Sequence, residues 1–149
     1  MSKHASDSSE QGVAESYMLT ALSRLLMLRL DPKSGNGSIQ ATLRPDGVDL
    51  KNRVIIEAYA HIGNLHGAQT HKVRADLLKL LLLERKFGGT WRKILCFADD
   101  SVAKTTRGNS WLAEAIREFN IEVHVIELPA EIAERVLHAQ QRQRMENAK

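Results

Sequence analysis

Three short apolar runs, separated by segments with the character of helices, constrain the fold of this chain most strongly. Residues 54–60, 91–98 and 121–128 are apolar over the length of a strand, and the first of them is rich in β-branched side chains. Residues 69–87 and 111–119 lie between them and are predicted to be helices. Strands that alternate with helices are typical of parallel pairing, so the pattern predicts an α/β domain.

The first part of the chain has a different order of predicted elements. Residues 13–30 carry apolar side chains at helical spacing, and Asp31-Pro32 ends the predicted helix. Residues 39–43 and 48–50 are predicted strands, joined by the turn-like Arg44-Pro45-Asp46-Gly47. Short turns favour antiparallel pairing of these first strands. With a terminal helix after Pro129, the expected order is α-β-β-β-α-β-α-β-α, a mixed sheet flanked by helices.

Length and composition agree with one globular domain. The chain has 149 residues, of which 43% are hydrophobic and 26% are charged. Residues 12–140 are predicted to form a single α/β domain, preceded by a disordered leader at residues 1–11 and followed by a polar tail at residues 141–149.

Cysteine use and the lack of a targeting signal indicate a cytoplasmic protein. The one cysteine, Cys96, cannot form an internal disulfide and lies in an apolar run, where a buried and unreactive thiol is expected. The N-terminal residues are polar and rich in serine, unlike a signal peptide, and the longest apolar run is too short to cross a bilayer.

The charge distribution permits a nucleic-acid partner. The formal net charge is only +3, but residues 72–93 hold seven Lys or Arg against Asp76 and Glu84, a local net charge of +5. The alternative is that these side chains are simply the solvated face of a helix.

Two acidic residues stand out as candidates for chemistry. Asp46 follows Pro45 at a turn, and Glu57 interrupts the apolar strand at residues 54–60. A carboxylate in a buried strand is costly unless it is paired or bound to a metal ion. On adjacent strands the two could converge on one Mg²⁺. Alternatively, Asp46 is an ordinary turn residue, and Asp49 competes with it for the metal.

The pattern Pro45-Asp46 followed by Glu57-Ala58 resembles the motif of the PD-(D/E)XK nuclease superfamily, which has a restriction-endonuclease-like fold with an α-β-β-β-α-β core. Residues 13–98 would form that core. The position of the motif lysine holds Tyr59 instead. Some members place this lysine on the following helix, where Lys72 is the natural substitute, with Gln69 on the same helix face.

The resemblance implies a metal-dependent endonuclease, a hydrolase of DNA phosphodiester bonds. Asp46 and Glu57 would hold Mg²⁺ (or Mn²⁺) with the Ala58 carbonyl, and Lys72 would orient the attacking water. Glu15, on the first helix, matches a supporting glutamate of some members. Because no separate DNA-reading module is evident, specificity would come from a homodimer, a protein partner or loops.

Other interpretations stay open. Tyr59 in place of lysine favours a catalytically degraded module that binds nucleic acid or a protein. Lys72 could be a surface lysine paired with Asp76. A cluster of His61, His66 and His71 with carboxylates could bind Zn²⁺ or Mn²⁺. Asp99-Asp100 end a predicted parallel strand, where α/β sheets bind small ligands or where the pair could cap the next segment.

Overall fold

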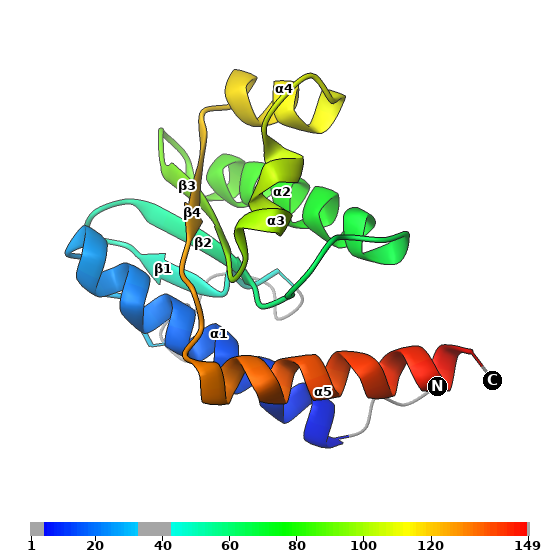
Figure 1. Cartoon of the computed structure of the whole chain (residues 1–149). Coiled ribbons are helices and arrows are strands. Elements are labelled where there is room, and N and C mark those ends of the chain that lie inside the picture. Colours follow the sequence, from blue (N-terminus) through cyan, green and yellow to red (C-terminus); the bar gives the residue numbers. More distant parts are fainter. Residues whose placement is uncertain (1–4, 33–42, 149) are drawn as a thin grey trace.

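The computed structural model describes residues 5–32 and 43–148, which form a mixed four-stranded sheet covered by helices on both faces (Figure 1). The elements in chain order are α1 (Ala5–Leu26), β1 (Gly47–Asp49), β2 (Val54–Tyr59), α2 (Ala68–Phe87), β3 (Arg92–Phe97), α3 (Asp100–Ala103), the 3₁₀ turn η2 (Lys104–Thr106), α4 (Trp111–Glu118), β4 (Ile121–Val125) and α5 (Ala130–Asn147).

The strands follow the order β1-β2-β3-β4 across the sheet. β1 runs antiparallel to β2, whereas β3 and β4 are each parallel to the strand before them. The predicted α/β class with an antiparallel start and parallel later strands is therefore confirmed. The strand predicted at residues 39–43 lies outside the described residues, apart from Leu43, which is not in a strand.

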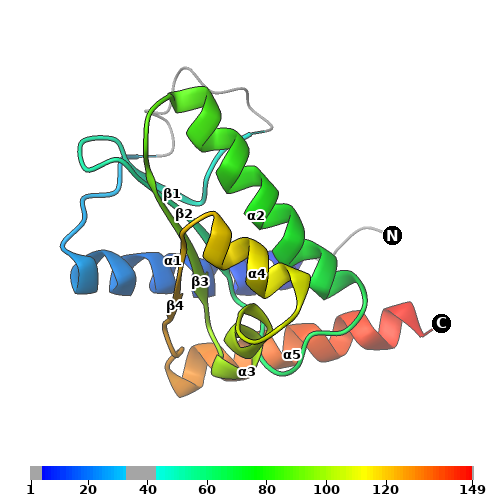
Figure 2. The same ribbon diagram turned by 90° about the horizontal axis from the view of Figure 1, so that it is seen from above.

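The alternation of side chains along β2 separates the two faces of the sheet. Val54, Ile56 and Ala58 are buried in a cluster with residues of α1 and α5, whereas Ile55 and Tyr59 are buried in a second cluster with residues of α2 and α4. The views in Figures 1 and 2 show this arrangement as three layers, with α1 and α5 on one side of the sheet and α2 and α4 on the other. Since Glu57 has the parity of Ile55 and Tyr59, it faces α2.

Both terminal helices are longer than the sequence predicts. α1 begins at Ala5, so residues 5–11 are helical and not a disordered leader. α5 continues to Asn147, so most of the segment predicted as a polar tail is helical too. Residues 141–147 are rich in Gln and Arg, which favour helix, whereas residues 5–11 hold three serines and are helical because helix extends readily from turns that packing holds in place. Within the described residues, no helix is both long and apolar enough to cross a membrane.

The end of α1 also differs from its predicted position. The helix stops at Leu26 because Met27 adopts a left-handed conformation with φ of 55°, and the Leu28 amide then hydrogen-bonds the Ser23 carbonyl. The chain therefore leaves the helix well before Pro32, which the sequence suggested as the stop.

Asp49 organises the turn between β1 and β2. Its carboxylate is 1% exposed and accepts hydrogen bonds from the Arg29 amide at 2.9 Å and from the Asn52 amide and side chain at 3.0 and 2.7 Å. Burial by itself would raise the pKa of Asp49, but these hydrogen bonds outweigh it and hold the pKa below its usual value. All of its bonds serve the fold, so Asp49 is a structural residue and not a competitor for a metal ion.

We expect Asp49→Ala to lower the free energy of unfolding by about 2–4 kcal/mol, because it removes the buried carboxylate that accepts three hydrogen bonds from Arg29 and Asn52. Denaturant unfolding of the variant and the wild type measures this loss. Asp100→Ala is the matched control, since the Asp100 carboxylate is exposed and pairs only with Arg107, and it should change stability by no more than about 0.5 kcal/mol. Equal effects of the two substitutions would contradict the structural role of Asp49.

Candidate active site

The carboxyl groups of Asp46 and Glu57 lie in contact at the edge of the sheet. The register pairs Gly47 with Ile56, so the next position outward sets Asp46 opposite Glu57. The Asp46 carboxylate accepts a hydrogen bond from the Ala58 amide at 2.9 Å, and it also hydrogen-bonds the side chain of Glu57. The structure thus brings together the two acidic residues that the sequence singles out.

Glu57 is the most deeply buried charged group of this cluster. It is 1% exposed, and burial together with the adjacent Asp46 raises its pKa to about 9, although Lys79 acts in the opposite direction. The raised pKa favours the protonated form of the Glu57 carboxyl, which can then share a proton with Asp46.

The ammonium group beside Glu57 belongs to Lys79, not to Lys72. Lys79 Nζ lies 2.7 Å from Glu57 Oε1, whereas Lys72 Nζ bonds Asp76 Oδ1 at 2.8 Å. The prediction that the Lys72 ammonium is directed to Glu57 is wrong, and the alternative pairing with Asp76 is the one observed. The two lysines are seven residues apart, which is two turns of α2, so both face the sheet.

Lys72 nevertheless lies within reach of the same charges. Burial by itself lowers the pKa of Lys72, but the hydrogen bond with Asp76 and the negative charges of Glu57 and Asp46 raise it above its usual value. Asp76 is 3% exposed, and burial raises the pKa of its carboxyl despite the pairing with Lys72. We call Asp46, Glu57, Asp76, Lys72 and Lys79 the acid–lysine cluster.

Asp76 and Lys79 are the members that the sequence analysis missed as parts of one site. A signal for them does exist, because positions 72, 76 and 79 fall on one face of a helix. That same face carries the buried Val73, Leu77 and Leu80, so charged residues there have to meet partners inside the fold.

The remaining predicted site residues have structural contacts. Tyr59, at the motif lysine position, is 7% exposed in the core and stacks on His61 with ring centroids 5.7 Å apart. Gln69 accepts a hydrogen bond from the His66 amide at 3.0 Å and so stabilises the start of α2. Glu15, on α1, lines a hollow that Asp46 also lines.

The other candidate ligand sets do not assemble. Among residues 5–32 and 43–148, no three or more His, Cys, Asp or Glu side chains gather in a way that could hold a metal ion. Asp99 accepts hydrogen bonds from the amides of Gly63 and Ser101, which makes it the cap of α3. Cys96 is buried, and burial raises the pKa of its thiol to about 12, as expected for an unreactive side chain.

The basic segment at residues 72–93 is largely neutralised by the fold. Four of its seven cations form ion pairs: Lys72 with Asp76, Lys79 with Glu57, Arg92 with Glu122, and Lys93 with Glu84. A fifth, Arg74, stacks over the ring of Trp111 at 4.8 Å. The local charge of +5 therefore does not form a single basic surface.

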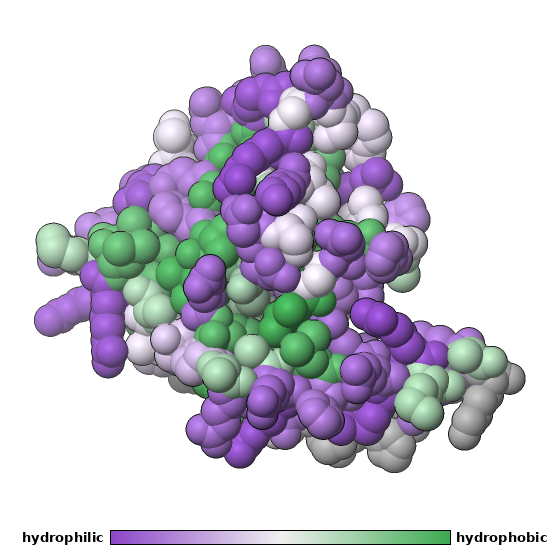
Figure 3. Space-filling view, viewed as in Figure 1, coloured by the Kyte–Doolittle hydropathy of each residue, from purple (hydrophilic) through white to green (hydrophobic). Residues whose placement is uncertain are grey.

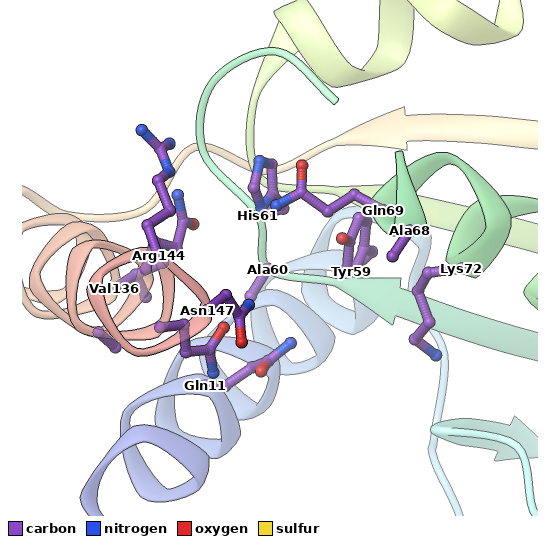
Figure 4. A pocket seen from close by; sticks show the side chains of 13 residues that line it. Gln11, Tyr59, Ala60, His61, Ala68, Gln69, Lys72, Val136, Arg144 and Asn147 are labelled. Carbon is purple, nitrogen blue, oxygen red and sulfur yellow. The ribbon is translucent and has the colours of Figure 1, made fainter. Parts of the chain in front are cut away.

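A cleft adjoins the acid–lysine cluster. It lies between the end of β2, the start of α2 and the last turns of α5, and it encloses about 240 Å³ (Figure 4). Tyr59 and Lys72 line this cleft and also interact with one another, so cleft and cluster are continuous.

No family model, curated protein or solved structure matches this chain. Its function has to be inferred from the acid–lysine cluster and the cleft beside it.

The pKa of Glu57 predicts a pH-dependent stability. A carboxyl whose pKa rises from 4.5 to about 9 on folding contributes stability that is complete below 4.5 and is lost as the pH rises through 9. In a chelating buffer, the melting temperature of wild type should therefore fall over this range relative to that of Glu57→Gln, by about 5 °C or more at the alkaline end.

The matched control is Glu118→Gln, which removes an exposed carboxyl of α4. The difference between its melting temperature and that of wild type should stay constant over the same range. Parallel curves for Glu57→Gln and wild type would show that Glu57 ionises normally in the folded protein.

Proposed function

We propose that this chain is a metal-dependent nuclease that hydrolyses phosphodiester bonds of DNA. The observation that carries the proposal is the contact between the Asp46 and Glu57 carboxyl groups with the Lys79 ammonium 2.7 Å from Glu57. Two carboxylates and one cation at a sheet edge are what the resemblance to the PD-(D/E)XK superfamily requires. The described elements α1, β1, β2, α2 and β3 are compatible with a restriction-endonuclease-like core, whose first strand was predicted at residues 39–43, outside the described residues apart from Leu43.

The donor atoms suit a hard divalent cation. Carboxylate oxygens are preferred by Mg²⁺ and Mn²⁺, and Mg²⁺ often uses only one or two carboxylates, with waters and substrate phosphates completing its shell. Glu57 Oε1 is buried and contacts the Lys79 ammonium at 2.7 Å, so a cation bound between the carboxylates would share this oxygen with Lys79. Asp46 is only partly buried, which gives the site an opening to solvent.

Each residue of the acid–lysine cluster has its own role in the proposed reaction. Asp46 and Glu57 would hold the cation, and Glu57 has to release its proton to do so. A bound divalent ion supplies Lewis acidity and a water of lowered pKa. Lys79 stabilises the ionised form of Glu57 and places a positive charge where negative charge develops on the phosphoryl group. The Lys72 side chain is 50% exposed and can contact the phosphate backbone of the substrate.

The second candidate function is a non-catalytic module that binds nucleic acid or a protein. The observation that favours it is Tyr59, which occupies the motif lysine position and is committed to the core. Lys79 weakens this alternative, because it supplies from α2 the cation that Tyr59 cannot supply from β2.

We expect Mg²⁺- or Mn²⁺-dependent cleavage of DNA by wild type and loss of cleavage in Glu57→Gln, with the variant still folded. Gel assays on single-stranded and duplex DNA measure the activity, and thermal melting in chelator tests the fold. Asp100→Asn, which alters an exposed carboxylate outside the cluster, should cut at the wild-type rate. If wild type cuts no DNA with either metal, the non-catalytic module becomes the better proposal.

Replacement of each lysine by methionine separates the roles of Lys79 and Lys72. Lys79→Met should reduce the cleavage rate about 10²–10³-fold, because it removes a charge held at the reacting centre. Lys72→Met should act mainly by weakening substrate binding, with a smaller effect at saturating DNA. Rates at several DNA concentrations distinguish the two effects. If Lys79→Met cleaves DNA at the wild-type rate, Lys79 is not the catalytic lysine and Lys72 becomes the candidate.

A further inference from the structure

The cleft beside the acid–lysine cluster has an unusual lining. Its walls hold the side chains of Gln11, Gln69, Gln140, Gln143 and Asn147, together with His61, Lys72 and Arg144, and none of the described residues that line it is acidic. Figure 4 shows Gln11 on α1, Gln69 and Lys72 on α2, and Arg144 and Asn147 on α5 around the end of β2, with the Lys72 and Arg144 side chains extending to opposite sides. A surface of this kind suits a ligand that is negatively charged and also rich in hydrogen-bonding groups.

Some side-chain amides of the cleft are hydrogen-bonded within the described part of the chain, whereas three others are not. Gln140 exchanges two hydrogen bonds with the backbone of Ile62, at 3.0 and 2.9 Å, which ties α5 to the segment after β2. Gln11, Gln143 and Asn147 make no hydrogen bond with other described residues. These three amides offer both donors and acceptors to whatever enters the cleft.

His61 supplies the second, independent sign of a ligand. It is 6% exposed, and its Nε2 atom makes no hydrogen bond with the described residues although it lies in the wall of the cleft. Burial lowers the pKa of His61, so the ring is neutral at physiological pH. Its ring also hydrogen-bonds the backbone of Asn64. Nε2 is thus a buried polar atom without a hydrogen-bond partner among these residues, and such an atom lowers the stability of the fold until a partner binds it.

We infer that this cleft takes one unpaired nucleotide of the substrate strand, with the base against His61 and the amides and the flanking phosphates near Lys72 and Arg144. Glutamine and asparagine amides match the donor and acceptor pattern of base edges. This inference rests on the proposed nuclease function, because it names the form of nucleic acid that the same site accepts.

The base has to be unpaired for steric reasons. His61 is only 6% exposed at the wall of the cleft, and a base that is stacked and paired within a duplex cannot reach so covered an atom. Lys72 lines the cleft and also bonds Asp76 of the acid–lysine cluster. A nucleotide in the cleft would therefore place an adjacent phosphate beside the carboxylates, so strand ends, single strands and frayed junctions are the expected substrates.

The test is binding in chelator, where no cleavage interferes. The fluorescence anisotropy of labelled single-stranded DNA, of the same strand in a duplex, and of a strand of equal length without bases gives the three affinities. Wild type should bind the single strand about tenfold or more tightly than either of the others. A free mononucleotide should compete weakly, since it lacks the flanking phosphates.

Two variants probe the cleft itself. His61→Phe keeps an aromatic ring but removes the Nε2 acceptor and the hydrogen bond to Asn64, so it should weaken single-strand binding about tenfold and leave binding of the baseless strand unchanged, with thermal melting as the check that the variant is folded. Arg144→Glu should weaken binding of both strands. Arg85→Glu makes the same charge change on the exposed end of α2, outside the cleft, and should alter neither.

The outcomes separate this inference from the nuclease proposal. Equal affinity for single strand, duplex and baseless strand, or a His61→Phe variant that binds as wild type does, would overturn the assignment of the cleft while leaving cleavage untouched. Selective single-strand binding through His61 by a protein that cuts nothing with Mg²⁺ or Mn²⁺ would support the cleft and overturn the nuclease proposal.

Discussion

The burial of the Glu57 carboxyl is the constraint on which the rest of this structure depends. A carboxyl group in the central part of a sheet is tolerated only if its charge is removed or matched. Here both solutions are present, since Asp46 favours the protonated form and Lys79 favours the ionised one. The group therefore lies between two charge states, and a cation or a change of pH can select one of them. A carboxyl needed only for the fold would have no use for an adjacent second carboxyl.

The sheet and the acidic pair were predictable because local signals determine them. The β-branched run of β2, the turn at Pro45-Asp46-Gly47 and the acidic interruption at Glu57 are all visible in the sequence. The lysine that pairs with Glu57 was not predictable, because it depends on the position at which α2 packs along the sheet. A shift of two turns decides between Lys72 and Lys79, and helix periodicity is the same for both. Packing of Val73, Leu77 and Leu80 fixes that position, and only the folded structure shows it.

The same limit explains why the basic segment gave a misleading impression of a nucleic-acid surface. Net charge counts residues near one another in the chain, but Glu57 and Glu122 neutralise Lys79 and Arg92 from other elements. Conversely, the cleft draws its cations from Lys72 and Arg144, which are far apart in sequence and form no cluster that a charge count would detect. The surface that suits an anion is thus created by the docking of α5, a helix whose polar last turns the sequence suggested were a tail.

The cleft and the acid–lysine cluster place complementary demands on one substrate. If the cluster holds a divalent ion as proposed, a phosphate oxygen of the substrate would help to complete its shell, because the contact between Asp46 and Glu57 supplies two carboxylates. The cleft needs a hydrogen-bonding group for His61 Nε2. Lys72 belongs to both, so a strand that fills the cleft brings its phosphate to the carboxylates, and the entry of a cation then requires Glu57 to lose its proton. On the proposed function, substrate and metal thus complete the site together, because the metal replaces the proton between the two carboxyl groups and the substrate satisfies His61 Nε2.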